Sequence, residues 1–200
     1  MTHRKPLLAL LASLLLAPLA ALLASDTPQL GPKPNIVLIL ADDLGYGDVS
    51  CYHAQTPIRT PHLDRMAAEG MRFTSFYAQP FCGPSRAALM TGCYPLRVAE
   101  IGNKKHHMTV PHGREMLLSE VLKRAGYATA QIGKWDLAGH VPDVFEHPEN
   151  TPLKRGFDRH FGTPASNDQW AKTALFRDGA VIENPVDLAE STTKRYADEA

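Results

Sequence analysis

The sequence has 200 residues, and its 21 Lys and Arg are balanced by 21 Asp and Glu, so the formal net charge is zero. This balance excludes the strongly basic surface on which nucleic-acid binding depends, and we expect no nucleic-acid partner. Hydrophobic residues make up 44% of the chain and charged residues 21%. Such a composition is typical of a globular protein with one packed core, and unlike that of a disordered or fibrous chain.

Residues 1–25 have the pattern of a secretory signal peptide. A short basic start is followed by an apolar stretch over residues 7–24 that only Ser13 and Pro18 interrupt. A membrane anchor is the alternative interpretation, because the run approaches the ~18 apolar residues at which a spanning helix becomes possible. Pro18 and the small residues near it favour cleavage. We therefore expect an exported protein, periplasmic or secreted, without a membrane partner once the signal peptide is removed.

The chain contains three cysteines, Cys51, Cys82 and Cys93. Export implies an oxidising compartment, in which thiols usually pair. An odd number of cysteines leaves at least one sulfur outside any intramolecular disulfide. The spacing alone does not determine whether the other two are paired.

Predicted strands follow the signal peptide at several places. Residues 35–41 form an unbroken apolar run, which is typical of a parallel strand covered on both faces. Residues 71–77 and 127–132 also have the pattern of strands. Residues 174–184 contain an Asp-Gly pair at their centre and predict a β-hairpin.

Helices are predicted between and after these strands. Start and stop residues indicate helices over residues 60–70, 84–90 and 115–125, with a fourth helix from residue 191 onward. Because strands and helices alternate, an α/β sheet is the expected architecture. The last helix has no stop signal, so we interpret residues 33–200 as the truncated N-terminal part of a longer catalytic domain.

Two adjacent aspartates, Asp42 and Asp43, follow the first predicted strand. Ligands bind at the carboxyl ends of strands in open α/β sheets. Neighbouring carboxylates repel each other unless a cation or strong donors neutralise them, and hard oxygen ligands suit Ca²⁺ or Mg²⁺. Taken alone, the pair is more often a helix cap or a solvated turn.

A second candidate site lies in residues 82–92, which read Cys-Gly-Pro-Ser-Arg-Ala-Ala-Leu-Met-Thr-Gly. Pro84 suits the first turn of a helix, so Cys82 is expected at the positive end of that helix, where an anion or a thiolate is stabilised. Arg86 lies one turn along and could hold an oxyanion or orient a group on Cys82. A buried cysteine beside a surface arginine would account for these two residues but not for the whole pattern.

This segment resembles the maturation signature of the type I, formylglycine-dependent sulfatases. In that family Cys-x-Pro-Ser-Arg, followed by Thr-Gly, marks the cysteine for oxidation to formylglycine. Other segments of the chain are similar to arylsulfatases in the same order: residues 35–48, 60–70, 126–135, 155–162, 166–168 and the hairpin at 178–179. The set is specific, because unrelated proteins are not expected to carry these segments in this order.

The resemblance implies an alkaline-phosphatase-like α/β sandwich, with a mainly parallel central sheet flanked by helices and incomplete in this chain. It implies a sulfuric ester hydrolase that cleaves a small-molecule or glycan sulfate ester. A formylglycine-generating enzyme would convert Cys82 into the nucleophile, and one Ca²⁺ ion would be held partly by Asp42, Asp43 and the modified Cys82. Arg86 and Lys134 would offset the negative charge of the sulfate.

The chain departs from the family pattern after Lys134. The family usually has a histidine two residues after this lysine, whereas this chain has Asp136. An aspartate cannot donate a hydrogen bond as a neutral imidazole can. We favour His140 as the source of the missing imidazole. The alternative is that the site tolerates a carboxylate and that Asp136 holds Lys134 or a neighbouring donor.

Two other functions remain open from the sequence. A phosphate or phosphonate ester hydrolase of the same superfamily would use a similar fold and a similar aspartate pair. A non-catalytic remnant that binds an anion or a metal would account for the missing histidine, and for the absence from these residues of the Asp-Asn metal pair and the distal His and Lys that the family carries later. The formylglycine signature favours the sulfatase.

Overall fold

The computed structural model describes residues 31–101, 109–111, 113–139, 141, 144–165, 173–186 and 192–200. The chain divides into two compact units, Met1–Asp43 and Leu44–Ala200. The predicted signal peptide over residues 1–25 lies outside the described residues. None of the helices in the described part of the chain has both the length and the apolar character needed to cross a membrane.

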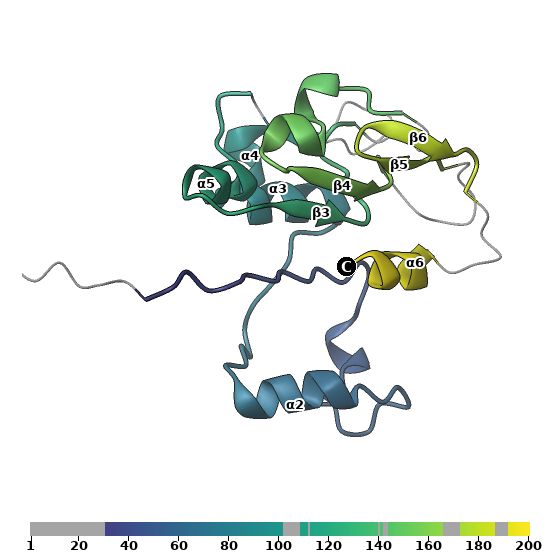
Figure 1. Cartoon of the computed structure of the whole chain (residues 1–200). Coiled ribbons are helices and arrows are strands. Elements are labelled where there is room, and N and C mark those ends of the chain that lie inside the picture. The colour runs from purple at the N-terminus through teal and green to yellow at the C-terminus, as the bar shows by residue number, and fades with distance from the viewer. Residues whose placement is uncertain are drawn as a thin grey trace, which may run out of the picture. The chain divides into compact units, whose positions relative to one another are not determined.

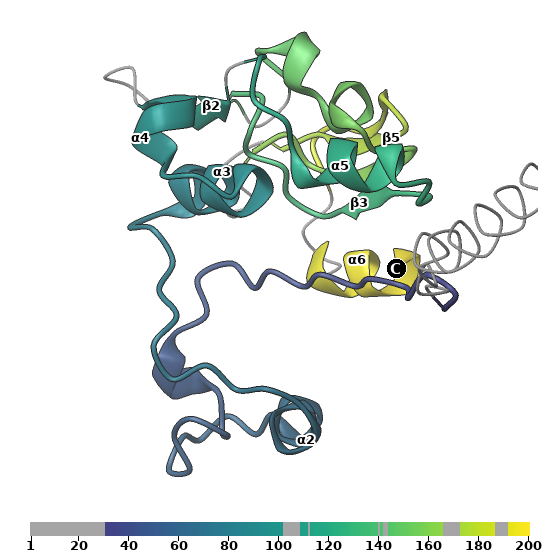
Figure 2. The ribbon, with the colours of Figure 1, turned by 90° about the vertical axis from the view of Figure 1, so that its left-hand side faces the viewer.

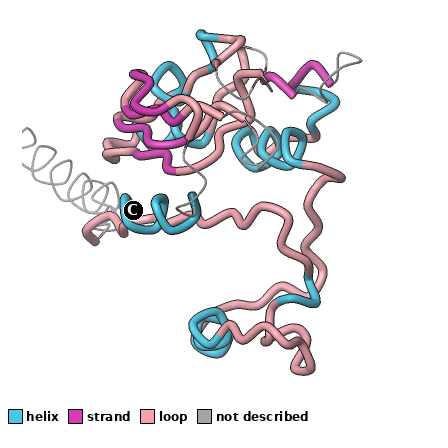
Figure 3. The backbone as a smooth tube through the Cα atoms, turned by 90° about the vertical axis from the view of Figure 1, so that its right-hand side faces the viewer, coloured by secondary structure: helices cyan, strands magenta, loops and turns pink. Residues whose placement is uncertain are grey.

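The described part of the first unit, residues 31–43, is loop (Figure 3). The prediction of a buried strand over residues 35–41 is therefore not met. The apolar side chains of this segment are exposed, Val37 at 83% and Ile39 at 78%. A parallel strand of this kind needs hydrogen-bonded neighbours and a layer on each face. No other described segment forms a ladder with it.

The second unit contains a mixed sheet of four strands in the order β3-β4-β5-β6 (Figure 1). The strands are β3 (Ala130–Ile132), β4 (Arg159–Gly162), β5 (Leu175–Arg177) and β6 (Ala180–Glu183). β3 pairs with β4 in parallel, and the other two pairings are antiparallel. The expected α/β architecture is present, with one parallel pairing in the described part of the sheet.

The predicted hairpin is confirmed by β5 and β6. Asp178 and Gly179 occupy the turn with φ angles of 48° and 86°. Positive φ at both central positions is characteristic of a tight hairpin turn that matches the twist of its strands. The Asp178 carboxylate also accepts a hydrogen bond from the backbone N–H of His160 at 2.9 Å, which ties the turn to β4.

All four predicted helices are present. They are α2 (Pro61–Glu69), α3 (Cys82–Thr91), α5 (Leu118–Arg124) and α6 (Thr192–Glu199). α3 begins two residues before the predicted start and ends at Gly92, whose φ of 68° is the left-handed conformation that glycine adopts without strain. α5 begins three residues later than predicted, because the Glu120 carboxylate caps the backbone N–H of Leu117 at 2.7 Å.

The strand predicted over residues 71–77 is wrong. This segment is loop, and Phe76 and Tyr77 are 79% and 85% exposed. The Tyr52 hydroxyl donates a hydrogen bond to the Phe73 carbonyl at 2.9 Å, so a side chain takes a backbone group that a neighbouring strand would otherwise use.

Short elements complete the second unit. β1 (Ala99–Ile101) and β2 (Thr109–Pro111) form a separate antiparallel pair, so the strand segments of Figure 3 gather in two places. The other elements among the described residues are α4 (Pro95–Val98) and the 3₁₀ turns η1 (Tyr46–Asp48), η2 (Pro148–Asn150) and η3 (Pro152–Arg155).

The main hydrophobic core joins α3 to the chain that follows β3. It contains Ala87, Met90, Leu117, Trp135, Leu137 and Ala138. Figure 2 shows α3 and α5 in the same layer of this unit, and the two helices are in contact. Because Ala87 and Met90 are buried against the residues after β3, one face of α3 is fixed beside Lys134 and its neighbours.

Candidate functional site

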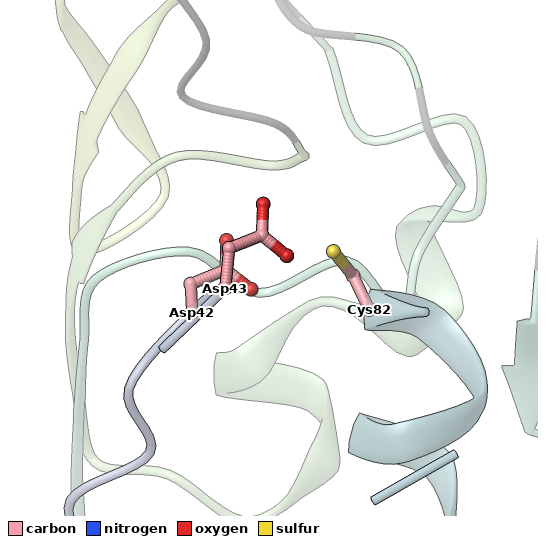
Figure 4. Close-up of side chains that lie close together, drawn as sticks. All are labelled: Asp42, Asp43 and Cys82. Carbon is pink, nitrogen blue, oxygen red and sulfur yellow. The ribbon is translucent and has the colours of Figure 1, made fainter. Parts of the chain in front are cut away.

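Cys82 is the first residue of α3, and its thiol is free and half-buried (Figure 4). Pro84 follows in the first turn, where the missing N–H of proline costs no hydrogen bond. The unpaired N–H groups of a helix start carry partial positive charge. The structure therefore places Cys82 where negative charge on its side chain would be stabilised.

Ser85 fixes the chain that enters α3. Its hydroxyl donates to the Phe81 carbonyl at 2.9 Å and accepts from the Gln79 backbone N–H at 3.1 Å. Both contacts lie immediately before Cys82. The serine of the Cys-x-Pro-Ser-Arg motif thus holds the segment from which Cys82 projects.

Arg86 is half-buried and contacts the chain after β3. Its Nη1 atom donates a hydrogen bond to the backbone carbonyl of Lys134, with 2.6 Å between the nitrogen and the oxygen. The two residues are 48 positions apart in the sequence. The fold therefore brings together two of the predicted catalytic residues, Arg86 and Lys134.

Lys134 and Asp136 form a buried ion pair. Lys134 Nζ lies 3.8 Å from Asp136 Oδ2, and the two side chains are only 4% and 3% exposed. Asp136 has a φ of 61°, a left-handed conformation that aspartate tolerates better than most residues. Its carboxylate therefore lies beside the lysine. This agrees with the alternative in which Asp136 holds Lys134. His140 lies outside the described residues.

The residues around Lys134 continue the pairing of β3 with β4. Backbone N–H groups of Gly133, Trp135 and Asp136 donate to carbonyls of the partner segment, over 2.8, 3.0 and 2.8 Å. The acceptors are Phe161, Thr163 and Pro164. Lys134 thus extends from a segment that is anchored on both sides of it.

Gly162 allows this close approach. A Cβ atom at Gly162 would lie 1.8 Å from the Gly133 carbonyl oxygen, far inside van der Waals contact. A larger residue would push the Gly133 peptide away from β4. The position of Lys134 therefore depends on a glycine in the neighbouring strand.

A buried arginine supports the other side of this segment. Trp135 Nε1 donates to the Asn150 carbonyl at 2.8 Å, and the Arg155 guanidinium donates to the Asn150 side chain. Arg155 also contacts Glu120 at 3.2 Å and the Glu115 carbonyl. The Arg-Gly-Phe-Asp segment that resembles the family thus has a packing role in this structure.

Asp42 and Asp43 are adjacent and exposed at the end of the first unit (Figure 4). Asp43 has a φ of 57°. Two carboxylates offer the hard oxygen ligands that Ca²⁺ prefers, whereas the soft thiol of an unmodified Cys82 does not suit this ion. A hydrated aldehyde at residue 82 would supply oxygen instead. Residue 82 would therefore suit Ca²⁺ as a ligand only after its modification.

Two further residues near Lys134 were not identified from the sequence. Gln131 in β3 and His160 in β4 are direct neighbours in the parallel register. His160 is 2% exposed, and burial lowers the pKa of its imidazole to about 4 although Asp178 acts in the opposite direction. Each is a single polar residue in a short strand, and no motif distinguishes it from a solvated side chain.

Comparison with known proteins places this site in a family. The model of the family described as Sulfatase matches residues 34–200. N-acetylgalactosamine-6-sulfatase of Rattus norvegicus is 47% identical over 164 residues, which cover 76% of this chain and 29% of that protein. Steryl-sulfatase of Mus musculus is 43% identical over 173 residues, which cover 77% of this chain and 27% of that protein.

A solved structure with a related fold carries a bound substrate. It is described as a complex with D-glucosamine-2-N,6-O-disulfate, and it matches this chain with a TM-score of 0.59 and 30% sequence identity. The match covers 76% of this chain and 28% of that one. The alkaline-phosphatase-like α/β fold is thereby confirmed. The chain spans less than a third of the length of these curated relatives, and it belongs to the sulfatase family.

Proposed function

We propose that the protein containing this chain hydrolyses sulfate monoesters, with a formylglycine made from Cys82 as nucleophile and one Ca²⁺ ion assisting. The observation that carries the proposal is the sulfatase signature at the start of α3, together with the hydrogen bond from Arg86 to the Lys134 carbonyl. Membership of the sulfatase family supports it.

Arg86 and Lys134 provide positive charge for a sulfate group. The two cations would offset the charge of the bound ester and the charge that builds on its oxygens during cleavage. The Arg86 guanidinium presents several donors in a fixed plane, which suits an oxyanion. Asp136 orients the Lys134 ammonium, since its carboxylate lies 3.8 Å from Nζ and both groups are buried.

Asp42 and Asp43 would hold the Ca²⁺ ion together with oxygen of the modified residue 82. When bound, the ion and the hydrated formylglycine would supply Lewis-acid charge and a hydroxyl nucleophile. This chain's own contribution is to present residue 82 at a positive helix end, and to hold it there through Ser85.

The proposed substrate is a small-molecule or glycan sulfate ester. One relative is named for N-acetylgalactosamine 6-sulfate and another for steryl sulfate, and the solved neighbour was obtained with a glucosamine disulfate. A formylglycine-generating enzyme is the proposed maturation partner. The signal-peptide pattern of residues 1–25 supports export to a periplasmic or secreted location.

The function is tested with the full reading frame that contains these residues, expressed with a formylglycine-generating enzyme. Hydrolysis of an aryl sulfate is compared with that of the matching aryl phosphate, and Cys82→Ala serves as control. Sulfate turnover that Cys82→Ala abolishes supports the proposal. Preference for the phosphate would establish the phosphoesterase alternative instead. Absence of both activities in protein with a modified residue 82 would favour a binding remnant.

A further inference from the structure

Gln131 places its side-chain amide beside the backbone of the residues that follow β3. Its Nε2 atom lies 3.2 Å from the Gly133 carbonyl oxygen and 3.3 Å from the Lys134 carbonyl oxygen. A primary amide nitrogen carries two hydrogens and can donate one to each of these carbonyls. The side chain therefore bridges two consecutive peptide groups where the chain leaves the strand.

The Lys134 carbonyl is shared between Gln131 and Arg86. Arg86 Nη1 donates to this oxygen at 2.6 Å, and Gln131 Nε2 donates to it at 3.3 Å. A carbonyl oxygen has two lone pairs, so these two donors can occupy both of them. The oxygen to which Gln131 is bound is thus the oxygen that locates the Arg86 guanidinium.

Gly133 makes such a restraint necessary. Its φ is 104°, a conformation open to glycine and rarely to other residues, and glycine restricts the following peptide least. The amide oxygen Oε1 of Gln131 is buried and has no hydrogen-bond partner among the residues the structure describes. The Gln131 amide is therefore oriented by its nitrogen, through the two carbonyls that it bridges.

We propose that Gln131 is a positioning residue that fixes the Gly133–Lys134 backbone and, through it, both Arg86 and the Lys134 side chain. The effect on activity that we expect from this role rests on the proposed sulfatase function. Gln131 itself does not contact the substrate. Its effect is geometric, and displacement of a binding group by about 1 Å can cost on the order of 100-fold in rate.

The test uses Gln131→Met, which keeps the length of the side chain and removes its donors. In the matured full-length protein, kcat/KM for an aryl sulfate is expected to fall by roughly 10- to 100-fold, with a higher KM as well as a lower kcat. Loss of folded protein alone would lower kcat and leave KM unchanged. Gln55→Met is the matched control, because Gln55 is exposed, and it should behave as wild type.

A double-mutant cycle tests whether the effect passes through Arg86. In an Arg86→Lys background, Gln131→Met should cause a smaller further loss than in the wild type, because the shared carbonyl no longer locates a guanidinium and only the effect through Lys134 remains. Independently of activity, backbone amides of residues 133–136 should exchange with deuterium faster in Gln131→Met than in Gln55→Met.

An unchanged KM, equal losses in both backgrounds or unchanged exchange would each overturn the proposal. An inactive wild type would instead refute the sulfatase function, while the exchange measurement would still decide the role of Gln131.

Discussion

Arg86 in α3 and Lys134 after β3 meet through the Lys134 backbone, because Arg86 Nη1 lies 2.6 Å from the Lys134 carbonyl oxygen. The contact leaves the Lys134 ammonium to a different partner, the Asp136 carboxylate at 3.8 Å. The two cationic side chains therefore have different partners, a backbone carbonyl for Arg86 and a carboxylate for Lys134. In the proposed function, these two cations would offset the negative charge of a sulfate ester.

The first prediction concerns Asp136. Because its buried carboxylate is beside Lys134, Asp136→Asn should weaken the orientation of the ammonium and lower aryl sulfate turnover by roughly 10²-fold. It should also lower the stability of the fold, because the Lys134 charge stays buried beside a neutral amide. Steady-state kinetics and circular dichroism of the matured full-length protein test this. His140→Ala is the comparison variant. If Asp136→Asn keeps normal turnover and His140→Ala loses most of it, His140 and not Asp136 takes the place of the family's histidine.

The second prediction concerns the contact between strands β3 and β4. Gly162→Ala should destabilise the protein by about 1–3 kcal/mol, because the new methyl group would overlap the Gly133 carbonyl. Urea unfolding measures the change in free energy. Gly113→Ala is the control, since a Cβ atom there would meet no atom within 4 Å. Equal stability of the two variants would mean that the strands do not approach as closely as described.

The third prediction is a pH dependence that arises from His160. Burial lowers the pKa of this imidazole to about 4 from 6.5, so the unfolded chain takes up a proton at a higher pH than the folded protein does. The stability contribution is complete above pH 6.5 and is lost as the pH falls toward 4, at up to about 1.4 kcal/mol per pH unit. Unfolding curves from pH 7 to 4.5 should show this slope in the wild type and a smaller one in His160→Leu. If the stability of the wild type and of His160→Leu falls equally with pH, the pH dependence does not arise from His160.

The fourth prediction concerns the metal. Asp42→Asn and Asp43→Asn each remove a negative oxygen ligand and keep the side-chain shape, so both should weaken Ca²⁺ binding and turnover together. Calorimetry with Ca²⁺ on the matured full-length protein, before and after chelation, measures the affinity. Asp48→Asn, in η1, is the matched acidic control. Wild-type activity of Asp42→Asn and Asp43→Asn in chelator-treated buffer would exclude a metal role for the pair.

Local signals predicted the helices and the hairpin well. Pro61 and Gly70 bound α2, Gly92 ends α3, and an Asp-Gly pair forms the turn between β5 and β6. These features depend on a few neighbouring residues, which the sequence shows directly. The family signature similarly indicated Cys82, Arg86 and Lys134 as site residues.

Features that depend on distant partners were not predicted. The run over residues 35–41 has the composition of a buried strand, but pairing requires neighbours that hydrophobicity alone does not specify. The meeting of Arg86 with the Lys134 carbonyl depends on the core between α3 and the residues after β3. The roles of Gln131 and His160 were also not predicted, because the surroundings of these side chains form only when β3 and β4 pair.

The identity of residue 82 in the mature protein decides whether this chain provides a formylglycine nucleophile. The full reading frame is expressed with an active formylglycine-generating enzyme, and the tryptic peptide that carries residue 82 is weighed by mass spectrometry beside that of Cys82→Ser. We predict that the wild-type peptide shows the mass change from thiol to aldehyde and reacts with a hydrazine probe. If Cys82 stays intact and is fully alkylated under these conditions, while a control substrate of the maturing enzyme is converted, Cys82 is not the precursor of a formylglycine nucleophile.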